Sequence, residues 1–134
     1  MALSSTSSSP QLLLVSDDVS VSDTCSRSLQ LDGFSVRVAF SATEGLALAE
    51  RHNPQVIVVD LRIPARPALD FIERLRRLPG LAHVPVALMT GDYFVAPAEL
   101  DRMQALGVTQ HFRPVWLSEL IEVARTLTLA TVPA

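Results

Sequence analysis

The chain has 134 residues, of which 49% are apolar and 19% are charged, a balance typical of one globular domain with a substantial core. Its formal net charge of −3 argues against binding to nucleic acid, and no apolar run is long enough to cross a membrane. The single cysteine, Cys25, excludes an internal disulfide, and all 11 basic residues are arginines, which excludes any mechanism that needs a lysine.

The sequence predicts one domain over residues 11–129, between a disordered Ser- and Thr-rich tail at 1–10 and a short tail at 130–134. The first tail lacks the basic start and the apolar stretch of a secretory signal, so we expect a cytoplasmic protein. The length leaves no room for a separate output or catalytic module.

Short apolar runs alternate five times with stretches of helical periodicity. The run at 56–59 is apolar on both faces, as in a parallel strand that helices cover on both sides. The predicted strands are 11–15, 35–39, 56–59, 84–89 and 108–112. Between and after them, apolar residues recur at spacings of three and four, which predicts amphipathic helices.

The predicted buried helix faces are, in chain order, Val21, Cys25, Ser28 and Leu29; Leu46 and Ala49; Leu69, Ile72 and Leu75; Leu100, Met103 and Leu106; and Leu117, Leu120, Ile121, Ala124 and Leu127. The alternation predicts an α/β fold of the (βα)5 type, a flavodoxin-like doubly wound parallel sheet with strand order 2-1-3-4-5. That order brings strands 1 and 3 together, and we expect function at their carboxyl ends.

Polar residues follow four of the predicted strands. Asp17 and Asp18 come after the first, Asp60 after the third, Thr90 at the end of the fourth and Arg113 after the fifth. Because carboxylates crowded at one sheet edge repel each other, they favour a divalent cation, and oxygen-only ligands favour Mg²⁺.

The runs 13–18, 58–64, 88–91 and 112–114 together resemble the receiver domain of response regulators in two-component signalling, and the resemblance covers residues 11–129. It implies that Asp60 accepts a phosphoryl group from a histidine kinase or phosphotransfer protein. It also implies a Mg²⁺ ion held by Asp17, by Asp60 and by the backbone carbonyl of Arg62. Thr90 would then bind the phosphoryl group and pass the signal to the face built from the fourth helix, fifth strand and fifth helix.

Several positions depart from the pattern of that family. Ser16 replaces the first acid of the usual pair, and the lysine expected before Pro114 is absent, with Arg113 as its candidate substitute. The switch position falls on Gln110 or on His111, depending on where the gap is placed.

Three further assignments stay open. Asp18 is either a metal ligand or a helix cap. Arg62 and Arg66 either supply positive charge near Asp60 or are solvated loop residues. Trp116, at the start of the last helix, is either an anchor for a partner or packs against its neighbours.

The leading functional hypothesis is therefore a stand-alone phosphoacceptor receiver that signals to a downstream protein effector, with a homodimer through the output face as a further expectation. The alternative is a degenerate receiver that binds its partner without phosphorylation. A phosphohydrolase is disfavoured, because such enzymes need a second aspartate where Arg62 stands. We therefore expect no enzyme activity, no nucleic-acid partner and no membrane partner.

Overall fold

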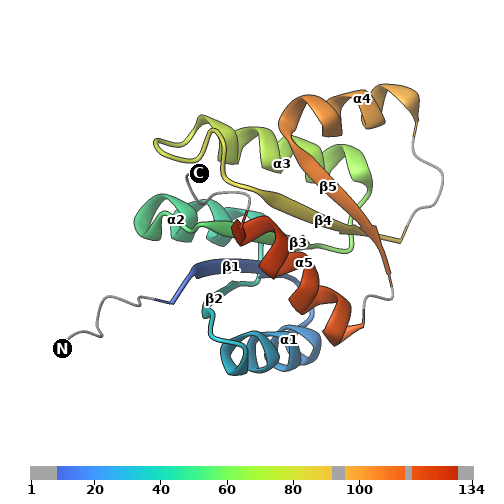
Figure 1. Cartoon of the computed structure of the whole chain (residues 1–134). Coiled ribbons are helices and arrows are strands. Elements are labelled where there is room, and N and C mark those ends of the chain that lie inside the picture. Colours follow the sequence, from blue (N-terminus) through green and yellow to red (C-terminus); the bar gives the residue numbers. More distant parts are fainter. Residues whose placement is uncertain (1–8, 92–95, 114–115, 130–134) are drawn as a thin grey trace.

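The computed structural model of the chain describes residues 9–91, 96–113 and 116–129. Parallel strands alternate with helices along the whole of this region (Figure 1). The strands are β1 (Gln11–Ser16), β2 (Ser35–Ala39), β3 (Val56–Asp60), β4 (Val86–Thr90) and β5 (Val108–Phe112). The helices are α1 (Val19–Leu31), α2 (Ala42–His52), α3 (Ala65–Arg77), α4 (Pro97–Leu106) and α5 (Leu117–Leu129). The strand order β2-β1-β3-β4-β5 confirms the predicted (βα)5 flavodoxin-like fold.

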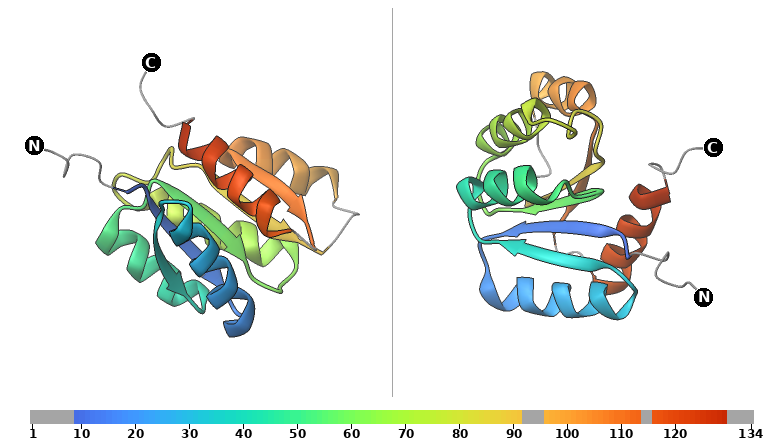
Figure 2. Two further views of the ribbon diagram at one scale, coloured as in Figure 1. Left: turned by 60° about the horizontal axis from the view of Figure 1, so that its bottom comes forward. Right: turned by 90° about the vertical axis from the view of Figure 1, so that its left-hand side faces the viewer.

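The sheet separates two layers of helices (Figure 2). Along β1, Leu13 and Val15 join a buried cluster with α2, α3 and α4, whereas Leu12 and Leu14 join a cluster with α1 and α5. Successive side chains of a strand point to opposite faces, so a strand between two helical layers must be apolar throughout. This explains the unbroken apolar run that predicted β3.

The layer on the α2 and α3 side is tightly packed. A Cβ atom added to Gly45 of α2 would lie 3.0 Å from Cζ of Phe71 and 3.1 Å from Cγ2 of Val15. Glycine therefore lets α2 approach the sheet and α3 more closely than any other residue would.

Two helices end on a residue with positive φ. Asn53 ends α2 with φ 46° and Gly107 ends α4 with φ 69°, both in the left-handed conformation that these residue types tolerate. The tails predicted at 1–10 and 130–134 lie outside the described residues, except for Ser9 and Pro10.

Some predicted details of the elements are wrong. Strand β4 begins at Val86, two residues later than expected. Leu100 and Leu117, assigned to buried faces, are 47% and 38% exposed. Both lie in the first turn of their helices, and burial begins only in the following turn, at Met103 in α4 and Leu120 in α5.

Candidate functional site

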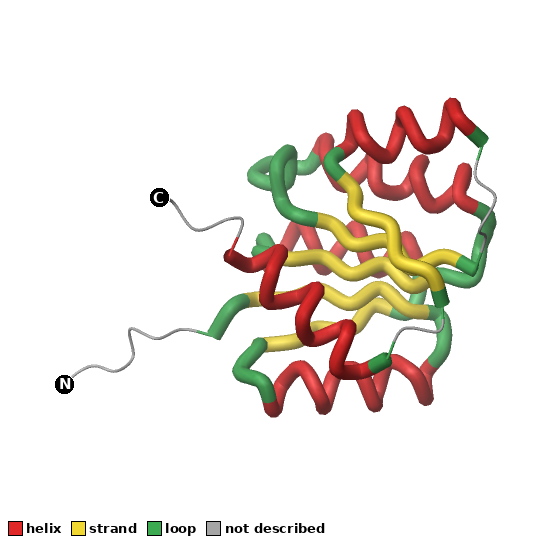
Figure 3. Tube along the Cα trace, turned by 45° about the vertical axis from the view of Figure 1, so that its right-hand side comes forward, coloured by secondary structure: helices red, strands yellow, loops and turns green. Residues whose placement is uncertain are grey.

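The polar residues singled out from the sequence gather at the carboxyl edge of the sheet, where all strands end together (Figure 3). Ser16 at the end of β1 is in register with Asp60 at the end of β3. Thr90 ends β4 in register with Phe112, and Arg113 follows directly. Charged side chains therefore gather at the switch point between β1 and β3, where the strand order predicted a functional site.

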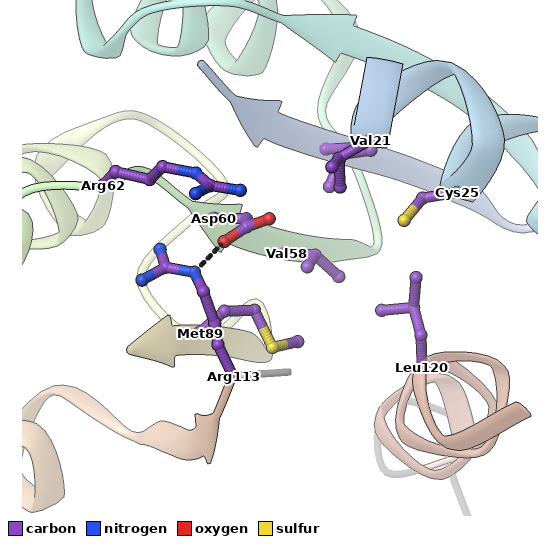
Figure 4. A pocket seen from close by; sticks show the side chains of 9 residues that line it. Val21, Cys25, Val58, Asp60, Arg62, Met89, Arg113 and Leu120 are labelled. Carbon is purple, nitrogen blue, oxygen red and sulfur yellow. Dashed lines mark hydrogen bonds and ion pairs between the residues drawn. The ribbon is translucent and has the colours of Figure 1, made fainter. Parts of the chain in front are cut away.

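The centre of this edge is an ion pair between Asp60 and Arg113 (Figure 4). Nε of Arg113 donates to Oδ1 of Asp60 at 2.7 Å, and Nη2 donates to the carbonyl oxygen of Leu61 at 2.9 Å. The Asp60 side chain is 15% exposed and that of Arg113 is 23% exposed. The backbone N–H of Arg113 donates to the carbonyl oxygen of Thr90 at 2.8 Å, which ties the arginine to the end of β4.

The loops after β1 and β3 are joined through Arg62. Its backbone N–H donates to Oδ2 of Asp17 at 3.0 Å, and its Nη2 lies 3.4 Å from Oδ2 of Asp18. Sequence reasoning did not anticipate these contacts, because they join residues 44 and 45 positions apart. The one sequence signal for them was an arginine, Arg62, two residues after Asp60. Arg66, the other arginine considered for this role, is exposed.

Asp18 acts as the helix cap, one of its two open assignments. Its Oδ1 accepts a hydrogen bond from the backbone N–H of Val21 at 3.0 Å, and it is the N-cap of α1. This role turns one carboxylate oxygen of Asp18 toward the helix. Among the residues described, no group of three or more His, Cys, Asp or Glu side chains is arranged to hold a metal ion.

The donor chemistry left at the site fits a weakly bound Mg²⁺ ion. Asp60 and Asp17 each keep one carboxylate oxygen without a hydrogen bond to any described residue. Mg²⁺ is usually bound by one or two carboxylates together with water and phosphate. The guanidinium groups of Arg62 and Arg113 oppose part of the negative charge, which weakens cation binding.

Gln110 is the residue of β5 that contacts Thr90. Its Nε2 donates to Oγ1 of Thr90 at 3.1 Å. His111 points to the other side of the strand, where Nε2 lies 3.0 Å from Oγ1 of Thr109. The geometry thus favours Gln110 over His111 for the switch position that the sequence left open.

Burial changes the acidity of two groups around the site. It raises the pKa of the Cys25 thiol, with a smaller contribution from the negative charge of Asp60. Burial lowers the pKa of His111, and the Glu119 carboxylate offsets part of that change.

Trp116 is solvent-exposed, with 73% of its surface accessible. Phe112 at the end of β5 is 40% exposed, and Leu117 and Leu100 are exposed as well. These residues belong to α4, β5 and α5 or to their immediate flanks, so part of the exposed apolar surface lies on the predicted output face. Other exposed apolar side chains, Val19, Leu31, Phe40 and Ile63, lie elsewhere.

The response regulator receiver domain family matches residues 12–112. The chain belongs to this family. Its members are signalling phosphoacceptors rather than catalytic enzymes, so the receiver resemblance and the expectation of a non-enzyme are confirmed.

Similar proteins extend this assignment. The receiver is 30% identical over 112 residues to RpaA of Synechocystis, a DNA-binding dual master transcriptional regulator, with 72% of this chain and 46% of RpaA covered. It is 33% identical to a 14.6 kDa protein of the sodA1 3′ region of Leptolyngbya boryana, with 91% and 92% covered. The chemotaxis protein CheY4 of Vibrio cholerae shares its fold, with a TM-score of 0.77, 23% identity, and 89% and 98% covered.

The receiver spans about half the length of the first curated relatives, 46% of RpaA and 56% of the acid tolerance regulatory protein ActR of Rhizobium meliloti. Within the part of the chain that the structure describes, no helix is long and apolar enough to cross a membrane.

Proposed function

We propose that this receiver accepts a phosphoryl group on Asp60 and signals through the surface of α4, β5 and α5. The observation that carries the proposal is the position of the Asp60 carboxylate, 15% exposed at the switch point and held on one side by Arg113. Its second oxygen makes no hydrogen bond to a described residue, so that oxygen remains available as a nucleophile.

The donor would be a phosphohistidine of a histidine kinase or of a phosphotransfer protein. The free carboxylate oxygen of Asp60 forms a bond to phosphorus while the bond from phosphorus to the imidazole nitrogen breaks. The electron pair of that bond stays on the imidazole, which recovers a proton from water. Little covalent chemistry is asked of the receiver, whose contribution is positioning and charge.

Arg113 takes the place of the missing lysine in this proposal. A phosphoryl group on Asp60 adds nearly two negative charges, and the guanidinium already bonded to Asp60 at 2.7 Å is the nearest cation. Thr90, which Gln110 already contacts at 3.1 Å, would turn its hydroxyl to the phosphoryl oxygens and transmit the change to β5.

Mg²⁺, when bound, would neutralise charge on the phosphoryl oxygens during transfer. Asp17 and Asp60 would hold it, together with the backbone carbonyl of Arg62. Asp18 is the weaker candidate because its carboxylate caps α1. We expect low affinity, since Ser16 supplies no charge where the family has an acid.

A phosphorylation-independent interaction module is the second candidate, and two observations favour it. Arg113 already pairs with Asp60, and Arg62 already pairs with Asp18, so two carboxylates of the site have cationic partners before any phosphoryl group arrives. Ser16 removes a further acid. In this version the surface around Trp116 binds a protein effector, or a second copy of the receiver, constitutively.

We further propose that the domain over residues 11–129 acts in the cytoplasm, with neither nucleic acid nor membrane as its own partner.

Incubation with acetyl phosphate and Mg²⁺, followed by intact-mass measurement, tests phosphoryl transfer. Wild type should gain one phosphoryl group and Asp60→Asn should gain none, because the amide cannot act as the acceptor. Asp18→Asn is the matched control, which removes a neighbouring carboxylate and should still be labelled. Equal labelling of wild type and Asp60→Asn, or no labelling of either, would remove Asp60 as the acceptor.

A further inference from the structure

A pocket of about 430 Å³ opens beside Asp60, between α1 and α5 (Figure 4). Its apolar lining comes from both helices and from the sheet beneath them, and three charged residues lie at one end. The lining residues are Leu14, Val21, Cys25, Val58, Met89 and Leu120, with Asp60, Arg62 and Arg113 as the charged group.

The deep walls are apolar and screened from water. Val58 is 1% exposed, while Met89 and Leu120 are each 4% exposed. Protein interiors rarely keep voids larger than a water molecule, and this volume lies within the range of about 300–1,000 Å³ that small-molecule sites occupy. In the opposite helical layer, by contrast, even a methyl group on Gly45 would crowd Phe71.

The space exists because α1 presents small side chains toward α5. Val21 and Cys25 are four positions apart, so they lie on the same face of α1, and both are only partly buried. In Figure 4 they face Leu120 of α5 across the pocket. A leucine or phenylalanine at either α1 position would narrow the pocket.

The charged end offers one cationic group to an anion. Of the two arginines that line it, Arg113 is paired with Asp60 at 2.7 Å. Arg62 is held less tightly by its ion pair than Arg113, because its side chain is 55% exposed and its Nη2 lies 3.4 Å from Oδ2 of Asp18. Nε and Nη1 of Arg62 make no hydrogen bond to a described residue, so either can donate a charge-assisted hydrogen bond to a carboxylate.

We propose that this pocket binds a small organic carboxylate, with its apolar body between α1 and α5 and its carboxylate on Arg62. Binding in this pocket would require neither a kinase nor a metal. Because Asp60 lines the same pocket, a bound carboxylate limits access to that residue. The receiver would then report a metabolite as well as, or in place of, a phosphoryl group.

Octanoate and 3-phenylpropanoate are the probes, one aliphatic and one aromatic, and amide NMR spectra of the whole chain measure their binding. At least one should cause saturable shifts at Val21, Cys25, Met89 and Leu120. Octanamide, which keeps the chain but not the charge, should bind about tenfold more weakly. Absence of saturable shifts with both carboxylates, or equal affinity for octanamide, would overturn the proposal.

The single cysteine provides a second readout on the unmodified protein. A bound carboxylate should slow alkylation of Cys25 by iodoacetamide severalfold, and an unchanged rate at saturating probe would contradict the pocket as the binding site. Cys25→Leu narrows the pocket and should weaken binding, and Arg62→Gln should weaken it about tenfold. Labelling of Asp60 by acetyl phosphate without any carboxylate is a separate measurement, so either proposal can fail alone.

Discussion

At the residue scale, the ion pair between Asp60 and Arg113 links the candidate phosphoacceptor to β5. Arg113 makes two side-chain hydrogen bonds, at 2.7 and 2.9 Å, that fasten the end of β5 to the end of β3. An arginine reaches both acceptors with its planar fork, whereas an ammonium group acts as a point charge.

Replacement of Arg113 should therefore separate two effects. Arg113→Ala should lower the free energy of unfolding by about 1–3 kcal/mol, because it leaves a mostly buried carboxylate without its charged partner. It should also uncouple labelling of Asp60 from changes in β5. Arg113→Lys should retain the coupling, and urea unfolding together with amide NMR measures both effects. Full coupling in the alanine variant would transfer the cationic role to Arg62.

His111 makes the stability of the receiver depend on pH. Burial lowers its pKa in the folded state, so protonation favours the unfolded state. Its contribution is complete above the ordinary histidine pKa of about 6.5 and is lost as the pH falls below that value toward the folded pKa. Stability should drop less over this range in His111→Gln than in wild type. A ring titration by NMR with a midpoint at or above about 6.5 would contradict this account.

At the element scale, Arg76 holds the output side of the fold together. From α3 it donates to the carbonyl oxygens of Leu106 at 2.9 Å and Leu81 at 3.1 Å, and it also bonds Val84. One half-buried side chain thus fastens the end of α4 and the loop before β4. Desolvation by this burial lowers the pKa of its guanidinium group.

Removal of the Arg76 side chain should destabilise the folded state. Arg76→Ala should lower the free energy of unfolding by about 2–3 kcal/mol, because it leaves several carbonyl groups without a charged donor. Arg77→Ala is the matched control, since the side chain of the neighbouring Arg77 is 72% exposed and its ion pair with a described residue is the one to Glu73, four residues earlier. Its effect should stay below about 0.5 kcal/mol. Chemical denaturation measures both free energies of unfolding. If the two variants lost similar amounts, Arg76 would not be the residue that holds α4 and the loop before β4 to α3.

The start of α5 presents Trp116 for contact with a partner. Its 73% exposure favours the anchor assignment over packing against Phe112 or Pro114, the second of which lies outside the described residues. Trp116→Ala should weaken self-association or effector binding by about 2 kcal/mol and leave the unfolding midpoint almost unchanged. Sedimentation and thermal unfolding measure the two quantities. A large loss of stability with unchanged association would identify Trp116 as a packing residue.

At the scale of the whole molecule, the fold was predictable and part of the site was not. Apolar runs such as 56–59 and the helical spacing of residues such as Leu69 and Ile72 are local patterns, and with the handedness of crossovers they determine the strand order. The strand ends then place Asp60, Thr90 and Arg113 at one edge. The Arg62–Asp17 contact and the pocket between α1 and α5 depend on packing between distant segments, which periodicity does not encode. The capping bond of Asp18 is local, and the sequence offered it as one of two assignments.

The central claim is that a phosphoryl group on Asp60 changes the output face through Arg113, Thr90 and Gln110. Amide NMR spectra of wild type and Asp60→Asn, recorded before and after addition of acetyl phosphate and Mg²⁺, test it most directly. The account predicts shifts in wild type at 60–62, 88–91 and 108–113 and along α4, with none in Asp60→Asn. Shifts confined to 60–62, or identical spectra of wild type with and without the phosphodonor, would contradict it and leave the phosphorylation-independent module.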